Sequence, residues 1–170
     1  MHFLRQVTGS KQVAFGSTAV YVMEKVRNCP VIVVPKLAEL TLPKEIVFPT
    51  SFKTHYKKRE LKYVIDVAKK YNSNIAILHV SKEKELDKNQ KEYKLLLEEI
   101  FDGVNYSFYN LSNYSVESAV NIFVESRNSD MVAFINKKHP FFSSFLATPM
   151  VKEISFHSKV PVLVMHDLRN

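Results

Sequence analysis

Short apolar runs alternate with longer amphipathic segments over most of the chain. Buried strands are predicted by the apolar runs at 45–49, 74–80, 131–135 and 160–165, and a more exposed strand by the alternating pattern at 103–109. Helical spacing predicts helices at 61–71, 87–101, 115–126 and 144–157, the second with Leu95, Leu96 and Ile100 directed inward. Strands that alternate with helices form right-handed βαβ units, so the pattern predicts a three-layer, doubly wound α/β domain with a parallel five-stranded sheet. Periodicity leaves two strand orders open, a flavodoxin-type order and 3-2-1-4-5.

An incomplete copy of the same pattern precedes this domain. Residues 12–27 have helical spacing, and the proline-bounded run at 29–35 predicts a further strand. The pair formed by 20–26 and 30–34 parallels the pair formed by 150–154 and 161–164, at a separation typical of tandem domains. We therefore expect 1–36 to be the carboxyl-terminal remnant of a first domain, 37–44 to be a linker, and 45–170 to be a complete domain. A remnant without its own sheet is not expected to fold alone.

Composition narrows the class of protein. The 170 residues are 46% hydrophobic and 24% charged, which is typical of a globular domain. The net charge of +7 leaves two interpretations open, a solvated lysine-rich surface or an anionic partner. The single cysteine, Cys29, excludes an internal disulfide and a zinc site built from several thiolates. No stretch approaches the ~20 apolar residues of a membrane span, so we expect a cytoplasmic protein without membrane partners.

Several short matches in the right order indicate a family. They are Phe15-Gly16-Ser17-Thr18-Ala19, Cys29-Pro30-Val31-Ile32-Val33-Val34-Pro35, Ile46-Val47-Phe48-Pro49-Thr50, Ile77-Leu78-His79-Val80 and Phe156-His157-Ser158-Lys159-Val160-Pro161-Val162-Leu163-Val164. Together they resemble universal stress proteins over nearly the whole chain. The resemblance implies the 3-2-1-4-5 order of the adenine nucleotide alpha hydrolase-like fold, with an extra helix–strand segment ahead of it. It also implies paired domains or a homodimer that meet through their last strands, here Val31, Ile32, Val33 and Val34 beside Val162, Leu163, Val164 and Met165.

The family has branches that bind nucleotide and branches that do not. Binders carry an Asp after the first strand and a Gly-x-x-Gly-(nine residues)-Gly-Ser/Thr stretch after the fourth, whereas this chain has Ser51 at the first position and no glycine in 136–149. A phosphate loop needs glycines and a free N–H at the helix start, and Pro149 offers neither. The incomplete copy keeps Gly16-Ser17-Thr18 but lacks the first two motif glycines. No cofactor is therefore expected, and ATP, although allowed by the family, is disfavoured.

In an open α/β sheet, ligands bind outside the carboxyl ends of the strands at the switch point, here between the first and fourth strands. Basic residues flank this crevice at 53–59 and 137–139, so an anionic small molecule is a candidate ligand and a solvated basic rim is the alternative. A phenylalanine cluster at 141–145 is expected to fill the space of the missing glycines. The candidate nucleotide- or anion-binding residues are Thr50, Ser51, Lys53, Val80, Lys137, Lys138, His139, Gly16 and Ser17.

No catalytic set is visible in the sequence. His79 falls on a predicted strand without a nearby nucleophile, so a packed histidine is expected, and no metal-ligand spacing occurs. His157 and His166 flank the last strand and could face a pairing partner. These observations predict a non-catalytic regulatory or dimerisation module. An ATP- or AMP-binding regulator and a nucleotide-cleaving α/β enzyme stay open as alternatives, and nucleic-acid binding is not supported by any motif.

Overall fold

The computed structural model describes residues 2–5, 17–36, 38–81, 83, 85–136 and 158–166. Within these residues the strands are β1 (His2–Arg5), β2 (Val31–Val34), β3 (Glu45–Thr50), β4 (Asn74–Ser81), β5 (Asn105–Ser112), β6 (Met131–Asn136) and β7 (Val162–His166). The helices are α1 (Ser17–Lys25), α2 (Lys58–Tyr71), α3 (Lys88–Ile100) and α4 (Val116–Arg127). None of these helices is long and apolar enough to cross a membrane. The helix expected at 144–157 lies outside the described residues.

The strands form one seven-stranded sheet in the order β1-β2-β7-β6-β3-β4-β5. From β7 to β5 every neighbouring pair is parallel. Counted from β3 to β7, this is the 3-2-1-4-5 order, so that prediction is confirmed and the flavodoxin-type order is wrong. The crossover from β4 to β5 runs outward, whereas β6 returns to the other side of β3. The switch point therefore lies between β3 and β6.

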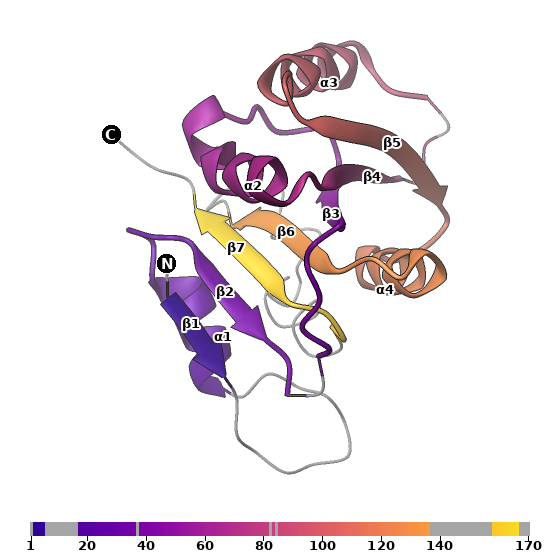
Figure 1. The fold of residues 1–170 in the computed structure, drawn as a ribbon. Coiled ribbons are helices and arrows are strands. Elements are labelled where there is room, and N and C mark those ends of the chain that lie inside the picture. The colour runs from indigo at the N-terminus through magenta and orange to yellow at the C-terminus, as the bar shows by residue number, and fades with distance from the viewer. Residues whose placement is uncertain are drawn as a thin grey trace.

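The amino-terminal segment extends the sheet beyond β7, as Figure 1 shows. β2 pairs with β7 in antiparallel register, with Ile32 opposite Leu163, and β1 pairs with β2 in parallel. β1 was not predicted, because four residues carry too little periodicity to define a strand. Val31 follows Arg5 by 26 positions and Val162 follows Asn136 by 26 positions, so β1-α1-β2 repeats the spacing of β6 and β7. The antiparallel seam relates the two units by an approximate two-fold axis.

Each face of the sheet has its own apolar core. One core is covered by α1 and α4, and the other by α2 and α3. Alternate residues of each strand enter the two cores, so Val162 and Val164 face α1 while Leu163 and Met165 face α2. The sheet and its two helical layers give the predicted three-layer architecture.

The inward face predicted for α3 is wrong for Leu95 and Leu96, whereas Ile100 is half-buried and packs against the core under α2 and α3 as predicted. Leu95 is 58% exposed and Leu96 is 36% exposed, whereas Leu97 and Gln90 are buried. Three consecutive leucines point in three different directions around the helix and are equally apolar, so the sequence alone could not show which of them faces the sheet. The helix begins after Asp87, whose carboxylate accepts a hydrogen bond from the Gln90 main-chain N–H at 2.8 Å, and its phase is decided by the packing of Leu97 against the sheet.

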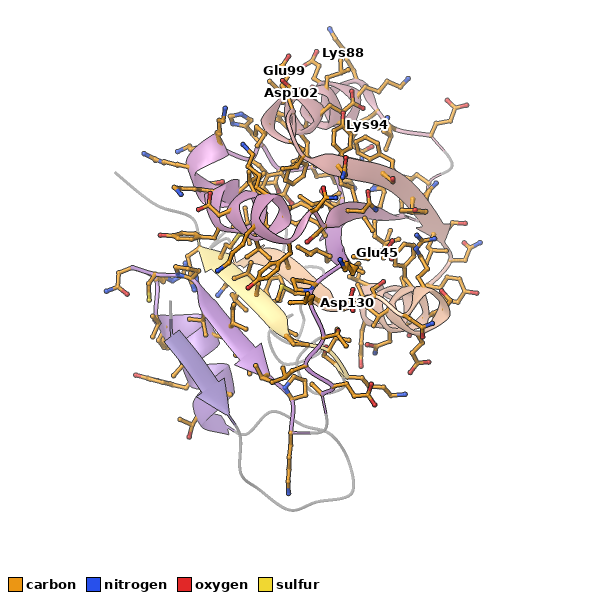
Figure 2. All side chains as sticks on the ribbon, viewed as in Figure 1. Glu45, Lys88, Lys94, Glu99, Asp102 and Asp130 are labelled. Atoms are coloured by element: carbon orange, nitrogen blue, oxygen red, sulfur yellow. The ribbon has the colours of Figure 1, made fainter. Side chains whose placement is uncertain are left out.

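The linker is bound to the sheet where it enters β3. The Asp130 carboxylate accepts hydrogen bonds from the Thr41 hydroxyl at 2.7 Å and from the main-chain N–H groups of Lys44 and Glu45 at 2.8 and 2.9 Å. Figure 2 shows Asp130 and Glu45 together at this junction. Glu45 in turn holds the end of α4 through the Arg127 guanidinium, at 2.6 and 2.9 Å. The amino-terminal segment is therefore connected to the domain through an anchored chain.

Candidate functional site

The loop after β3 folds back over the carboxyl end of the sheet. β3 ends at Thr50, whose hydroxyl oxygen accepts a hydrogen bond from the Phe52 N–H at 3.1 Å. Phe52 has a φ of 55°, in the left-handed region that bulky residues rarely adopt. This conformation turns the loop inward. As a result the Phe52 side chain is only 3% exposed, although it belongs to a connecting loop.

The Phe52 ring covers the end of β4. It stacks on His79 with ring centroids 4.8 Å apart and an interplanar angle of 29°, and its centroid lies 6.0 Å from that of Phe108 on β5. Thr50 and His79 are register partners on neighbouring parallel strands, so their carboxyl ends lie at the same level. An aromatic side chain thus occupies the carboxyl end of the sheet over β4 and β5, on the face covered by α2 and α3.

Beneath the Phe52 ring, the polar groups satisfy one another. The Nδ1 atom of His79 lies 3.1 Å from the main-chain oxygen of Thr50 and must carry the hydrogen, because a carbonyl only accepts. The hydroxyl groups of Thr50 and Tyr56 are 3.4 Å apart, and the Gln90 amide donates to the Ser51 main-chain oxygen at 2.9 Å. These bonds connect the β3–α2 loop to β4 and α3.

Burial keeps the two titratable groups of this cluster neutral near pH 7. It lowers the pKa of His79, an effect that the hydrogen bond to the Thr50 carbonyl partly opposes. Burial also raises the pKa of Tyr56 to about 12. In addition, no group of three or more His, Cys, Asp or Glu side chains in the described ranges is placed to hold a metal ion. The described part of the cluster offers packing and hydrogen bonding, without an activated nucleophile.

The candidate residues from the sequence lie in different surroundings. Thr50 is buried, Ser51 is half-buried and Lys53 is exposed, all on the β3–α2 side of the crevice. Val80 is 5% exposed and belongs to the core under α1 and α4, on the opposite face from His79. Ser17 is the first residue of α1. Lys137, Lys138, His139 and Gly16 lie outside the described residues, as does the phenylalanine cluster at 141–145.

Sequence reasoning missed the residues that fill the described side of the crevice. Phe52, Tyr56 and Gln90 come from a loop and from the first turn of α3, where hydrophobic periodicity carries no signal. An aromatic residue two positions after a buried strand was the available clue for Phe52. Its left-handed conformation could not be read from the sequence, since glycine and asparagine are the usual residues there.

A separate hollow of about 330 Å³ lies at the amino-terminal edge of the sheet, between the end of α2 and the start of β5. Its lining includes Lys69, Asn72 and Asn105, and the Asn105 amide donates to the Asn72 side-chain oxygen at 3.3 Å. Ligand sites of open α/β sheets lie at the carboxyl ends of the strands, on the opposite edge. The crevice around Thr50 therefore stays the candidate site.

Comparisons with known proteins agree with this architecture. No protein-family model and no curated protein matches the sequence. Among solved structures, a universal stress protein from Archaeoglobus fulgidus superposes with a TM-score of 0.61 at 17% identity, over 86% of this chain and 52% of that one. A second from that organism gives 0.54 at 14% identity, over 71% of this chain and 92% of the other. A third, in complex with dAMP, gives 0.52 at 15% identity, over 74% and 99%.

These likenesses concern the fold, because the identities are low. The chain spans about half the length (52%) of the first of these structures and nearly all of the other two. The chain therefore has the fold of the universal stress proteins.

Proposed function

We propose that this protein is a non-catalytic regulatory and pairing module of the universal stress protein type, which does not hold an adenine nucleotide in the family manner. The observation that supports this most is the Phe52 side chain, buried at the carboxyl ends of β3 and β4 and stacked on His79. A ligand there would have to displace an aromatic ring that already has its partners. It would also have to break the hydrogen bonds of this cluster, and their loss would leave buried polar atoms without partners.

The chemistry of the crevice supports the same proposal. Ser51 stands where nucleotide-binding members of the family carry Asp, and its main-chain oxygen already accepts a hydrogen bond from Gln90. The neutral state of His79 at pH 7 gives no cation for a phosphate. Catalysis would require a nucleophile with an adjacent base, and the polar groups of Thr50, Tyr56 and His79 are engaged with one another instead.

The pairing role rests on the seam between β2 and β7. Val31, Ile32 and Val33 pair there with Val164, Leu163 and Val162, and both strands are largely buried. The alignment with the first solved structure spans 86% of this chain and 52% of that structure. The alignments with the other two structures span only 71% and 74% of this chain. This supports a paired arrangement of an incomplete and a complete unit. A homodimer through β7 would require β2 to leave that edge.

Isothermal titration calorimetry with dAMP and with ATP tests the nucleotide part of the proposal. We expect no saturable heat with either ligand for the native chain. The Phe52→Ala variant, checked for folding by circular dichroism, serves as a comparison in which the ring that fills the crevice is absent. Saturable binding of dAMP or ATP to the native chain would overturn the proposal.

An adenine-nucleotide-binding regulator is the second candidate, and the dAMP complex of one structural relative favours it. On that reading Phe52 moves aside when nucleotide binds. A Phe52→Ala variant that binds dAMP at least tenfold more tightly than a measurable native affinity would favour this candidate. Inorganic polyphosphate in the same titration tests the anionic ligand suggested by Lys53 and its basic neighbours.

A further inference from the structure

His166, the last residue of β7, has a buried polar side chain whose lost hydration is not replaced by hydrogen bonds. It is 4% exposed, and neither of its ring nitrogens has a hydrogen-bond partner in the described structure. Buried polar side chains nearly always have at least one partner, because an unpaired one loses its hydration without replacement. Packing of the surrounding elements must therefore hold this imidazole in place.

The polar and charged groups placed near His166 come from β6 and from the turn between α1 and β2. From β6, Asn136 is its register partner, and the Asn136 amide donates to the Met23 main-chain oxygen of α1 at 3.2 Å. From the turn between α1 and β2, the Arg27 guanidinium lies 3.5 Å from the Asn136 main-chain oxygen. Arg27 is the charged group that acts on His166, and no carboxylate of the described residues does so.

The seam itself brings a third group to this level. Val31 of β2 pairs with Val164 of β7, so the antiparallel register brings Cys29 level with His166. Cys29 is half-buried and is the single cysteine of the chain. The amino-terminal segment thus supplies the cation beside His166 and brings the single cysteine to the same level of the seam.

A proton on His166 would act against this arrangement. It would place a second positive charge beside Arg27 in a site shielded from water, at a cost that neither a hydrogen bond nor a carboxylate offsets. Burial, with a smaller contribution from Arg27, accordingly lowers the pKa of His166 from 6.5 to about 4. Separation of α1 and β2 from β7 would hydrate the imidazole and remove Arg27.

We propose that the α1–β2 segment is an acid-released cap on the β7 edge, with His166 as its latch. At neutral pH the uncharged imidazole is compatible with the closed seam. In acid the charged imidazole favours the open form, which frees the outer edge of β7 for another strand.

The size of the effect follows from the two pKa values. With 6.5 in the open form and about 4 in the closed form, the open population rises about 20-fold between pH 7 and pH 5. Because the pKa of His166 is lower in the closed form than in the open form, the free energy that favours closure decreases as the pH falls. Closure is fully favoured above pH 6.5 and loses its advantage as the pH falls toward about 4.

Cys29 provides a built-in reporter for the test. Its rate of reaction with 4,4′-dithiodipyridine, divided by the rate in the urea-unfolded chain at the same pH, is the sum of a closed-form rate, because Cys29 is half-buried, and a contribution proportional to the open population. We expect the open-form contribution to rise about 20-fold from pH 7 to pH 5 in the native chain, and to stay flat in His166→Gln. His55→Gln, which removes an exposed histidine far from the seam, should keep the native profile. Arg27→Gln should show a smaller rise than the native chain.

Two results would overturn the proposal. One is a flat native profile, or one that His166→Gln leaves unchanged. The other needs no variant, and so does not depend on how the variants fold: an NMR titration in which every histidine of the native chain has a midpoint near 6.5. Hydrogen exchange adds a spatial check, because acid should lower the protection factors of the β2 amides, taken against the intrinsic exchange rate at each pH, ahead of those of β4.

Discussion

Phe52 allows a sharp test of how the crevice is built, because two of its properties oppose each other. Its ring is buried, 3% exposed, between His79 and Phe108, which stabilises the fold. Its backbone has a φ of 55°, which costs a non-glycine residue about 1–2 kcal/mol. Substitution by alanine removes the first property and keeps the second. Substitution by glycine removes both.

The two variants should therefore fall in an unusual order. Truncation of a buried phenylalanine to alanine costs about 3–5 kcal/mol of unfolding free energy. Glycine at the same position loses the same ring but regains about 1 kcal/mol, because it adopts the left-handed region without strain. We expect Phe52→Gly to be more stable than Phe52→Ala by about 1 kcal/mol. Urea denaturation followed by circular dichroism measures both free energies of unfolding.

Phe108 supplies the matched control. It lies in β5, in extended backbone and half-buried, so glycine there should be less stable than alanine by about 0.5–1 kcal/mol. The order of the two substitutions should thus reverse between the two phenylalanines. If Phe52→Ala were as stable as Phe52→Gly, the left-handed backbone would not be the device that turns this loop over the crevice.

Three further substitutions test the seam, the linker and the junction at β3. Ile32→Lys places a charge in the buried seam opposite Leu163, so we expect a loss of about 3 kcal/mol or more in urea denaturation, and an unchanged stability would argue against the β2–β7 pairing. Asp130→Ala removes two hydrogen bonds to the linker and one to the first residue of β3, and should cost about 2 kcal/mol, with faster hydrogen exchange at Lys44. Unchanged exchange would mean that the linker is held by other contacts. Arg127 lowers the pKa of the Glu45 carboxyl chiefly through its hydrogen bond, so this pair stabilises the fold above pH 4.5 and less as the pH falls below it. Arg127→Gln should accordingly destabilise the chain more at pH 7 than at pH 3, and an equal loss at both would refute the linkage.

The alternation of apolar runs and amphipathic segments sufficed to predict the elements that the structure describes between residues 45 and 166, because buried parallel strands and their covering helices have distinct periods. The cap of α4 was also readable, since Ser115 stands where a side-chain oxygen can accept from the Ser118 N–H, at 3.2 Å in the structure. The strand order came from family resemblance. Local patterns do not encode which strands become neighbours.

Three features were decided by tertiary structure. The phase of α3 depended on how Leu97 met the sheet, because Leu95, Leu96 and Leu97 are equivalent in sequence. β1 became a strand because β2 offered it an edge to pair with. The filling of the crevice by Phe52 depended on a left-handed backbone that contacts with His79 and Thr50 stabilise.

The sequence by itself thus determined most of the helices and strands that the structure describes, and it predicts that the chain carries one complete unit and part of another. Tertiary structure decided which side chains close the crevice and that His166 is buried beside Arg27. The physical reason is the difference in sequence separation over which these effects act. Periodicity and capping act over a few neighbouring residues, whereas burial and electrostatic environment arise between residues such as 27 and 166 that only the folded sheet brings together.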